Sequence, residues 1–163
     1  MAQIYDNRRR RGSLRVWGLS LVMVFGACSA NGPGVIGPHG GKLAPCPDRP
    51  NCVCSDADDA RHRVAPFTFR EGSAADAWAA LGAHVSALPR ARVVTVSPDY
   101  LHAEIRSRVF RFVDDLEFYL RPQTGVIAVR SAARAGYADL GVNRRRIEAI
   151  RNHLAGLGIL RDP

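Results

Sequence analysis

The pattern of apolar and polar residues predicts a series of strands in the second half of the chain. β-Branched and aromatic residues, alternating with polar ones, predict strands at residues 63–69, 92–97, 100–107, 112–121 and 125–131. Pro98-Asp99, a short loop at 108–111 and a turn at 122–124 separate the last four strands. Because connections this short cannot cross over a sheet, these four strands must be antiparallel neighbours.

Helical spacing of apolar residues occurs on both sides of this series. One helix follows Ser73, a residue type favoured at helix N-termini, and stops at Pro89. The other begins at about Leu140 or Arg144 and ends at Leu157. The apolar faces consist of Ala77, Trp78, Leu81, Val85 and Leu88 in the first helix and Ile147, Ile150 and Leu154 in the second.

The resulting order, β-α-β-β-β-β-α, predicts an α+β fold. In it, an antiparallel meander of four to five strands carries the helices packed on one face. Alternation assigns each strand residue to a face. The face toward the helices holds Leu101, Ala103, Ile105, Leu116, Phe118, Leu120, Ile127 and Val129. The opposite face holds His102, Glu104, Arg106, Asp115, Glu117, Tyr119, Ala128 and Arg130, and therefore carries charges of both signs.

The N-terminal region reads as a targeting signal. Arginines at positions 8–11 and 15 precede an apolar run at 16–25 and the small residues before Cys28. This order predicts a bacterial lipoprotein signal peptide at residues 1–27, with lipid attached to Cys28. The run falls short of the roughly 20 residues that span a bilayer, so a permanent transmembrane helix is the weaker interpretation. The prediction places the chain in the bacterial cell envelope, lipid-anchored to a membrane and facing the periplasm.

Composition separates a tether from a single domain. Residues 28–42 are rich in Gly and Pro and predict a flexible tether, and residues 43–163 predict one α+β domain. Residues 1–27 contain five of the 23 basic and one of the 15 acidic residues, so 18 basic and 14 acidic residues remain after cleavage. That mild excess, without a basic tract interleaved with aromatic residues, argues against nucleic acid as a partner.

Three cysteines lie close together in a Pro-rich stretch. In an exported protein, Cys46, Cys52 and Cys54 are expected to form one disulfide. We favour Cys46 with Cys52, because Cys52 and Cys54 are too close in an extended chain to bridge without strain. The alternative is a zinc site completed by His39 or His62, although this cysteine spacing is not a usual zinc pattern. We therefore predict neither a metal nor a cofactor.

Several long strings resemble a known family. Residues 100–107, 112–118 and 129–146, with the opening segments 43–47 and 50–53, are similar to the bacterial and plastid family called domain of unknown function 1499 (DUF1499). The resemblance covers about residues 43–157. A serine usually stands at the position of Cys54 in that family, which supports Cys46 and Cys52 as the structural pair. The family's activity is unknown, so the resemblance implies no reaction.

The residues of the last string nevertheless suggest a binding site. Arginines at 144–146 open the last helix, where the helix dipole disfavours cations, so we expect a compensating group. Arg130 and Arg134 could join them there and hold a phosphate or carboxylate. The alternative is an internal ion-pair network with Asp114, Asp115 and Asp139. The candidate ligand-binding residues are Arg106, Asp114, Asp115, Arg130, Arg134, Tyr137, Asp139, Asn143 and Arg144.

Two functions follow from these residues. The first is a non-enzymatic binding or scaffolding domain that holds an anionic small molecule or a protein partner at the cell envelope. The second is a cofactor-free hydrolase in which His102, with Glu104 or Asp115, acts as general base. No nucleophile elbow or Gly-rich phosphate loop accompanies His102, so we favour the first and assign no catalytic residue.

Overall fold

The computed structural model describes residues 35–70, 72–108 and 111–161. The predicted signal peptide at 1–27 and the lipidation site Cys28 lie outside this part of the chain. None of the helices within the described ranges is long and apolar enough to cross a membrane.

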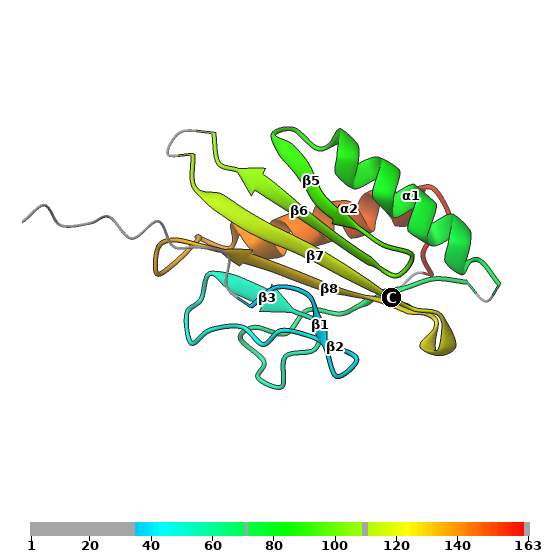
Figure 1. Ribbon diagram of the computed structural model, residues 1–163, viewed down its shortest axis with the longest axis horizontal. Coiled ribbons are helices and arrows are strands. Elements are labelled where there is room, and N and C mark those ends of the chain that lie inside the picture. The colour runs from blue at the N-terminus through cyan, green and yellow to red at the C-terminus, as the bar shows by residue number, and fades with distance from the viewer. Residues whose placement is uncertain (1–34, 71, 109–110, 162–163) are drawn as a thin grey trace, which may run out of the picture.

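The principal sheet has six strands and confirms the α+β class (Figure 1). Its main path runs β3-β8-β7-β6-β5, with all neighbours antiparallel. These strands are β3 (Cys52–Cys54), β5 (Ala91–Val96), β6 (Tyr100–Arg106), β7 (Val113–Arg121) and β8 (Val126–Ala133). A short 3-10 helix, η1 (Pro122–Thr124), connects β7 to β8. The predicted meander therefore occupies β5 to β8.

The sheet differs from the prediction beside β8. The strand expected at residues 63–69 contracts to β4 (Phe67–Thr68), which pairs with Val126 and Ile127 at the start of β8. The unpredicted strand β3 pairs farther along β8, at positions 130–132. β8 thus pairs with two short strands, β4 and then β3, along the same edge. β3 was not predicted because its three residues, in a Pro-rich stretch, are too few to show the alternation of apolar and polar residues that marks a strand.

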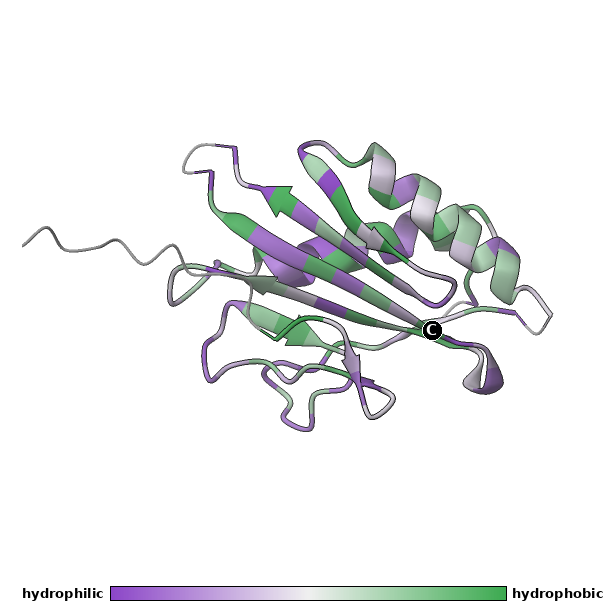
Figure 2. Cartoon of the chain, viewed as in Figure 1, coloured by the Kyte–Doolittle hydropathy of each residue, from purple (hydrophilic) through white to green (hydrophobic). Residues whose placement is uncertain are grey.

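Both helices pack on one face of the sheet, as predicted (Figure 1). Helix α1 (Ala74–Ala87) and helix α2 (Val142–Gly156) share one apolar core with β6, β7 and β8. Phe118 and Ile127 in the middle of this core are fully buried. Figure 2 shows the cause, since hydrophobic and hydrophilic residues alternate along these strands.

The opposite face of the sheet is covered as well. Apart from β3, residues 35–62 form a second layer that contains the hairpin of β1 (Pro38–His39) and β2 (Lys42–Leu43). Leu43 packs with Cys54, Tyr100 and Ala128 in a small second core. The part of the expected tether that the structure describes, residues 35–42, therefore lies against the domain. The polar face of the sheet is consequently interior, not solvated.

Candidate functional site

The covered face of the sheet contains a buried network of charged side chains. At one centre of it, Glu117 is fully buried and accepts three hydrogen bonds. Arg130 Nη1 donates to Glu117 Oε1 over 2.7 Å, and the Tyr100 hydroxyl donates to Oε2 over 2.8 Å. The backbone N–H of Gly37 donates to Oε2 over 2.7 Å, which fastens the N-terminal layer to the sheet.

A second centre lies around Asp115 on the same strand. His102 Nε2 lies 2.8 Å from Asp115 Oδ1. Arg134 donates to both oxygens of Asp115 and, through Nη2, to Glu104 Oε1 over 2.7 Å. The guanidinium of Arg134 thus binds two carboxylates from neighbouring strands. Of the three carboxylates considered for an internal ion-pair network from the sequence, Asp115 lies in this cluster, together with His102 and Glu104 of the predicted polar face.

The network holds its members in fixed protonation states. Burial alone would raise the pKa of Asp115, but hydrogen bonds from His102 and Arg134 bring that pKa below its usual value. The hydrogen bond from Arg134 likewise lowers the pKa of Glu104. Burial and the neighbouring Glu117 raise the pKa of Tyr100, whose hydroxyl therefore stays neutral. Both Asp115 and Glu104 are ionised at neutral pH.

A cavity of about 520 Å³ opens beside this network, between the sheet and the N-terminal layer. Its charged lining consists of three arginines, Arg49, Arg130 and Arg134, and one carboxylate, Asp115. Arg49 is exposed, and its side chain has no partner among the described residues. Because Glu117 pairs with Arg130 and both Asp115 and Glu104 pair with Arg134, Arg49 is the one arginine of the lining without a paired carboxylate among the described residues.

Two polar atoms of the cavity's lining residues lack hydrogen-bond partners within the described ranges. They are Oδ1 of Asn51 and Nε of Arg130, both buried. An unsatisfied buried polar atom costs roughly 1–3 kcal/mol. One atom is an acceptor and the other a donor, and neither is exposed on the surface of the cavity.

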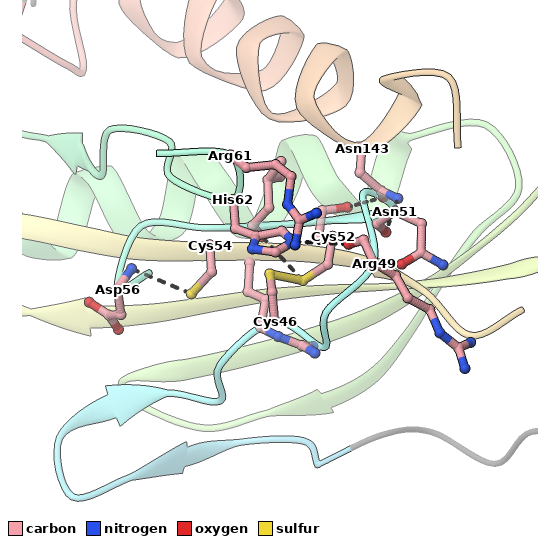
Figure 3. Close-up of a disulfide and its surroundings, with 12 residues drawn as sticks. Cys46, Arg49, Asn51, Cys52, Cys54, Asp56, Arg61, His62 and Asn143 are labelled. Atoms are coloured by element: carbon pink, nitrogen blue, oxygen red, sulfur yellow. Dashed lines mark hydrogen bonds between the residues drawn. A yellow bond between two sulfur atoms is a disulfide. The ribbon is translucent and has the colours of Figure 1, made fainter. Parts of the chain in front are cut away.

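A disulfide lies beside the cavity, because one of its cysteines, Cys46, lines the cavity (Figure 3). Cys46 is bonded to Cys52, as predicted, and Cys54 is a buried free thiol whose pKa is raised by burial. Arg49 lies between the bonded cysteines in the sequence, and its carbonyl oxygen is 2.9 Å from His62 Nε2. The loop that carries Arg49 is therefore supported from within the cover.

Asn51 joins this loop to two distant parts of the chain. The side-chain Nδ2 of Asn51 donates to the backbone carbonyl of Gly136. The backbone carbonyl of Asn51 accepts from Nδ2 of Asn143 in α2 (Figure 3). The described residues contain no group of three or more side chains suited to a metal ion. The zinc alternative with His39 or His62 therefore has no ligand set in this region.

The remaining predicted site residues lie elsewhere. Asp114 and Asn143 are on the helix face of the sheet, where Arg146 Nη2 donates to Asp114 Oδ2 over 2.7 Å. Burial nevertheless raises the pKa of Asp114, outweighing the opposite effect of Arg146. Asp139 accepts from the backbone N–H groups of Gly141 and Asn143 and thereby compensates the start of α2.

The expected convergence of arginines near the start of α2 does not occur. Among the described residues Arg144 contacts no carboxylate, because Nη1 and Nη2 donate to the backbone carbonyls of Arg63 and Arg61 over 2.8 Å. The ion pair is made by Arg146 instead, three positions after Asn143 on the same helix face. Arg106 and Tyr137 are exposed and lie outside both clusters. Only Asp115, Arg130 and Arg134 of the predicted set line the cavity.

Sequence reasoning missed four residues that matter here. Arg49 and Asn51 lie in a segment without periodic pattern, so only their closeness to the cysteines was a signal. Glu117 was correctly assigned to the polar face, but its burial depends on a cover that alternation cannot reveal. Arg146 could have been identified by its helical spacing from Asn143.

Comparison with known proteins gives the chain's relationship. A search of curated proteins and a search of solved structures each found no match. The family described as "Protein of unknown function (DUF1499)" matches residues 42–154. That range contains the sheet strands β3 to β8, the disulfide and nearly all of both helices. Because the match covers well over half of the sequence, the chain belongs to the DUF1499 family.

Proposed function

We propose that this chain is a lipid-anchored protein of the bacterial cell envelope, facing the periplasm, that binds a small anionic molecule without transforming it. The observation that carries the proposal is the cavity whose lining has three guanidinium groups against one carboxylate. Arginine presents its donors in a planar fork that matches carboxylate and phosphate oxygens.

Buried Arg130 and partly buried Arg134 are already oriented for such a role. Glu117 fixes Arg130, while Asp115 and Glu104 fix Arg134, so neither has to be ordered when a ligand enters. Their charges are largely compensated by these partners. Arg49 supplies the uncompensated positive charge at the rim, and it is the residue on which anion affinity should depend most.

The lining limits the ligand class. Guanidinium groups pair with carboxylate and phosphate oxygens, and a cavity of about 520 Å³ suits a small molecule. We therefore infer a small carboxylate or phosphate as the ligand.

The hydrolase hypothesis has less support from the geometry. His102 does lie within hydrogen-bond distance of Asp115, as a general base held by a carboxylate would. However, His102 is buried, and it does not line the cavity that Asp115 lines. A substrate in that cavity would meet the arginines and not the imidazole.

Anion binding predicts a thermal shift that depends on Arg49. At about ten times its Kd, a ligand stabilises the folded state by about 1.4 kcal/mol, a rise of roughly 3–6 °C in melting temperature. Glycolate and inorganic phosphate, titrated separately against the full chain, are the probes. Arg49→Ala should leave the ligand-free melting temperature unchanged and reduce the rise to about 1 °C, as for a tenfold loss of affinity.

Arg70→Ala is the matched control for this measurement. Arg70 is another exposed arginine, in the loop that follows β4 at the opposite end of β8. Its replacement should leave the thermal shift intact. An equal loss of the shift in both variants would show a general charge effect and contradict the cavity site, as would the absence of any shift with either probe.

The anchor makes a separate prediction. Cys28→Ser removes the thiol that would carry the lipid, so radiolabelled palmitate should no longer be incorporated when the chain is expressed in a bacterium. Cys54→Ser, which removes a buried thiol from the domain, should incorporate the label as the unaltered chain does. Labelling that persists in the Cys28→Ser chain would overturn the anchor.

A further inference from the structure

A second concave region lies at the end of the sheet, away from the cavity beside the disulfide. It has a volume of about 620 Å³ and is formed where β5 begins, β6 ends and β7 begins. Five arginines line it and no acidic residue does: Arg90, Arg92, Arg106, Arg108 and Arg111. All five are exposed.

The positive charge of this arginine basin is largely uncompensated within the described ranges. Arg92 Nε lies 3.5 Å from Glu104 Oε2, and Glu104 already binds Arg134. Arg90 Nε donates to the backbone carbonyl of Arg106, which does not neutralise its charge. Like charges held so close repel each other, and an anionic surface would relieve that repulsion.

The backbone is strained at two of the five positions. Arg90 has a φ of 61° and Arg111 a φ of 55°, in the left-handed region that side chains with a Cβ rarely adopt. Such conformations persist where the surrounding structure imposes them, and they concentrate at functional sites. Here both place an arginine at the edge of the same basin.

The basin lies at the end of the sheet where the described chain begins. Val35 lines the disulfide cavity together with Ala133 and Arg134 at the end of β8. At that end of the sheet the residues paired across neighbouring strands are Ala133 in β8, Asp114 in β7, Ile105 in β6 and Ala91 in β5 (Figure 1). At about 4.8 Å per strand, the two sites are roughly 15 Å apart across the sheet.

This position determines what the basin would face. The chain from Cys28 to Val35 can extend over no more than about 25 Å. A lipid on Cys28 would therefore hold this end of the domain next to the bilayer. Phe112, which follows Arg111, adds a half-exposed aromatic side chain at the same edge.

We propose that the arginine basin docks the domain on a membrane surface rich in anionic phospholipid, by binding the phosphate groups of the lipid head groups. This inference rests on the proposed lipid anchor for its choice of partner. Docking would fix the orientation of the domain relative to the bilayer, which the anchor alone would leave free.

Vesicle flotation tests this docking. The chain from residue 28 onward, carrying Cys28→Ser so that neither a lipid nor the basic, apolar segment 1–27 is present, is mixed with vesicles of phosphatidylcholine alone or with about 30 % phosphatidylglycerol. Binding should be stronger on the anionic vesicles. Removing two arginines as Arg108→Ser with Arg111→Gly should weaken the binding that depends on phosphatidylglycerol by about fivefold per arginine, or about 25-fold together. Glycine at 111 suits the positive φ, so the folded state is retained.

The control removes the same charge from the other end of the sheet. Arg70→Ser with Arg161→Ser should change binding less than twofold. Both residues lie at the other end of the sheet, where the backbone N–H of Arg161 donates to the carbonyl of Thr68 in β4. Equal losses in both double variants would show a general electrostatic effect and overturn the proposal. Equal flotation with phosphatidylcholine alone and with the anionic vesicles would also overturn it, because the basin would then show no preference for anionic head groups.

The two proposals can fail independently. The flotation experiment lacks Cys28, so it reports on the basin alone. Palmitate labelling reports on the anchor alone, and the glycolate and phosphate shifts of the Arg49 variant report on the disulfide cavity. A melting temperature of the Arg108→Ser/Arg111→Gly chain within a few degrees of the parent shows that a loss of flotation is not a loss of folding.

Discussion

Replacing Glu117 with Leu is expected to lower the free energy of unfolding by roughly 3–5 kcal/mol. Glu117 is fully buried and is the carboxylate partner of Arg130, whose side chain is 5 % exposed. Removing the carboxylate leaves the guanidinium buried with no counter-charge. It also removes the acceptor for Tyr100 and for the Gly37 N–H. Urea denaturation followed by circular dichroism measures the change.

Two further variants separate this effect from simple loss of a charge. The double variant Glu117→Leu/Arg130→Met removes both ions and should recover most of the stability, because a buried ion pair is often replaceable by apolar residues of similar size. Glu148→Ala, which removes a partly exposed glutamate of α2, should cost less than about 1 kcal/mol. If Glu117→Leu lowered the free energy of unfolding as little as Glu148→Ala does, the buried network would make no measurable contribution to stability.

Arg146→Ala should destabilise the fold by roughly 2–4 kcal/mol, whereas Arg144→Ala should cost about 1 kcal/mol or less. Arg146 binds buried Asp114 and also donates to Ser131 and Asn143, so its loss leaves several buried groups without a partner. Arg144 binds only backbone carbonyls near the surface, which water can reach. The same urea titrations compare the two.

The sequence alone would reverse the expectation for these arginines. The predicted site contains Arg144, with a ligand or a carboxylate as its expected partner, and it omits Arg146. In the structure Arg144 binds the backbone carbonyls of Arg61 and Arg63 instead. A larger loss for Arg144→Ala than for Arg146→Ala would contradict the geometry described here.

The part of the fold that follows from local pattern was predictable. Alternation placed Leu116 and Glu117 on opposite faces, and helical spacing gave both helices to within about two residues. The disulfide between Cys46 and Cys52 also followed from spacing and compartment. Each of these depends on neighbours in the chain, which a single sequence displays.

The candidate site was only partly predictable, because its cover has no periodic pattern. Residues 35–62 are rich in Gly and Pro at their start, and nothing in them indicates which face of the sheet they meet. The burial of Glu117 and the cavity beside Arg49 both depend on that contact. The alternation of apolar and polar residues therefore predicts which residues lie on the polar face of the sheet, but it does not predict that this face is buried.

The hydrogen bond from Gly37 to Glu117 joins residues that are 80 positions apart, and this separation governs the order of assembly. The cover precedes β6, β7 and β8 in the sequence and is therefore synthesised first, yet its binding surface does not exist until these strands have paired. Closing so long a loop is slow, and it is rewarded only after the sheet is complete. The earliest segment of the domain is thus the last to dock. Until then the charges of the sheet stay hydrated, so their desolvation belongs to the final step of folding.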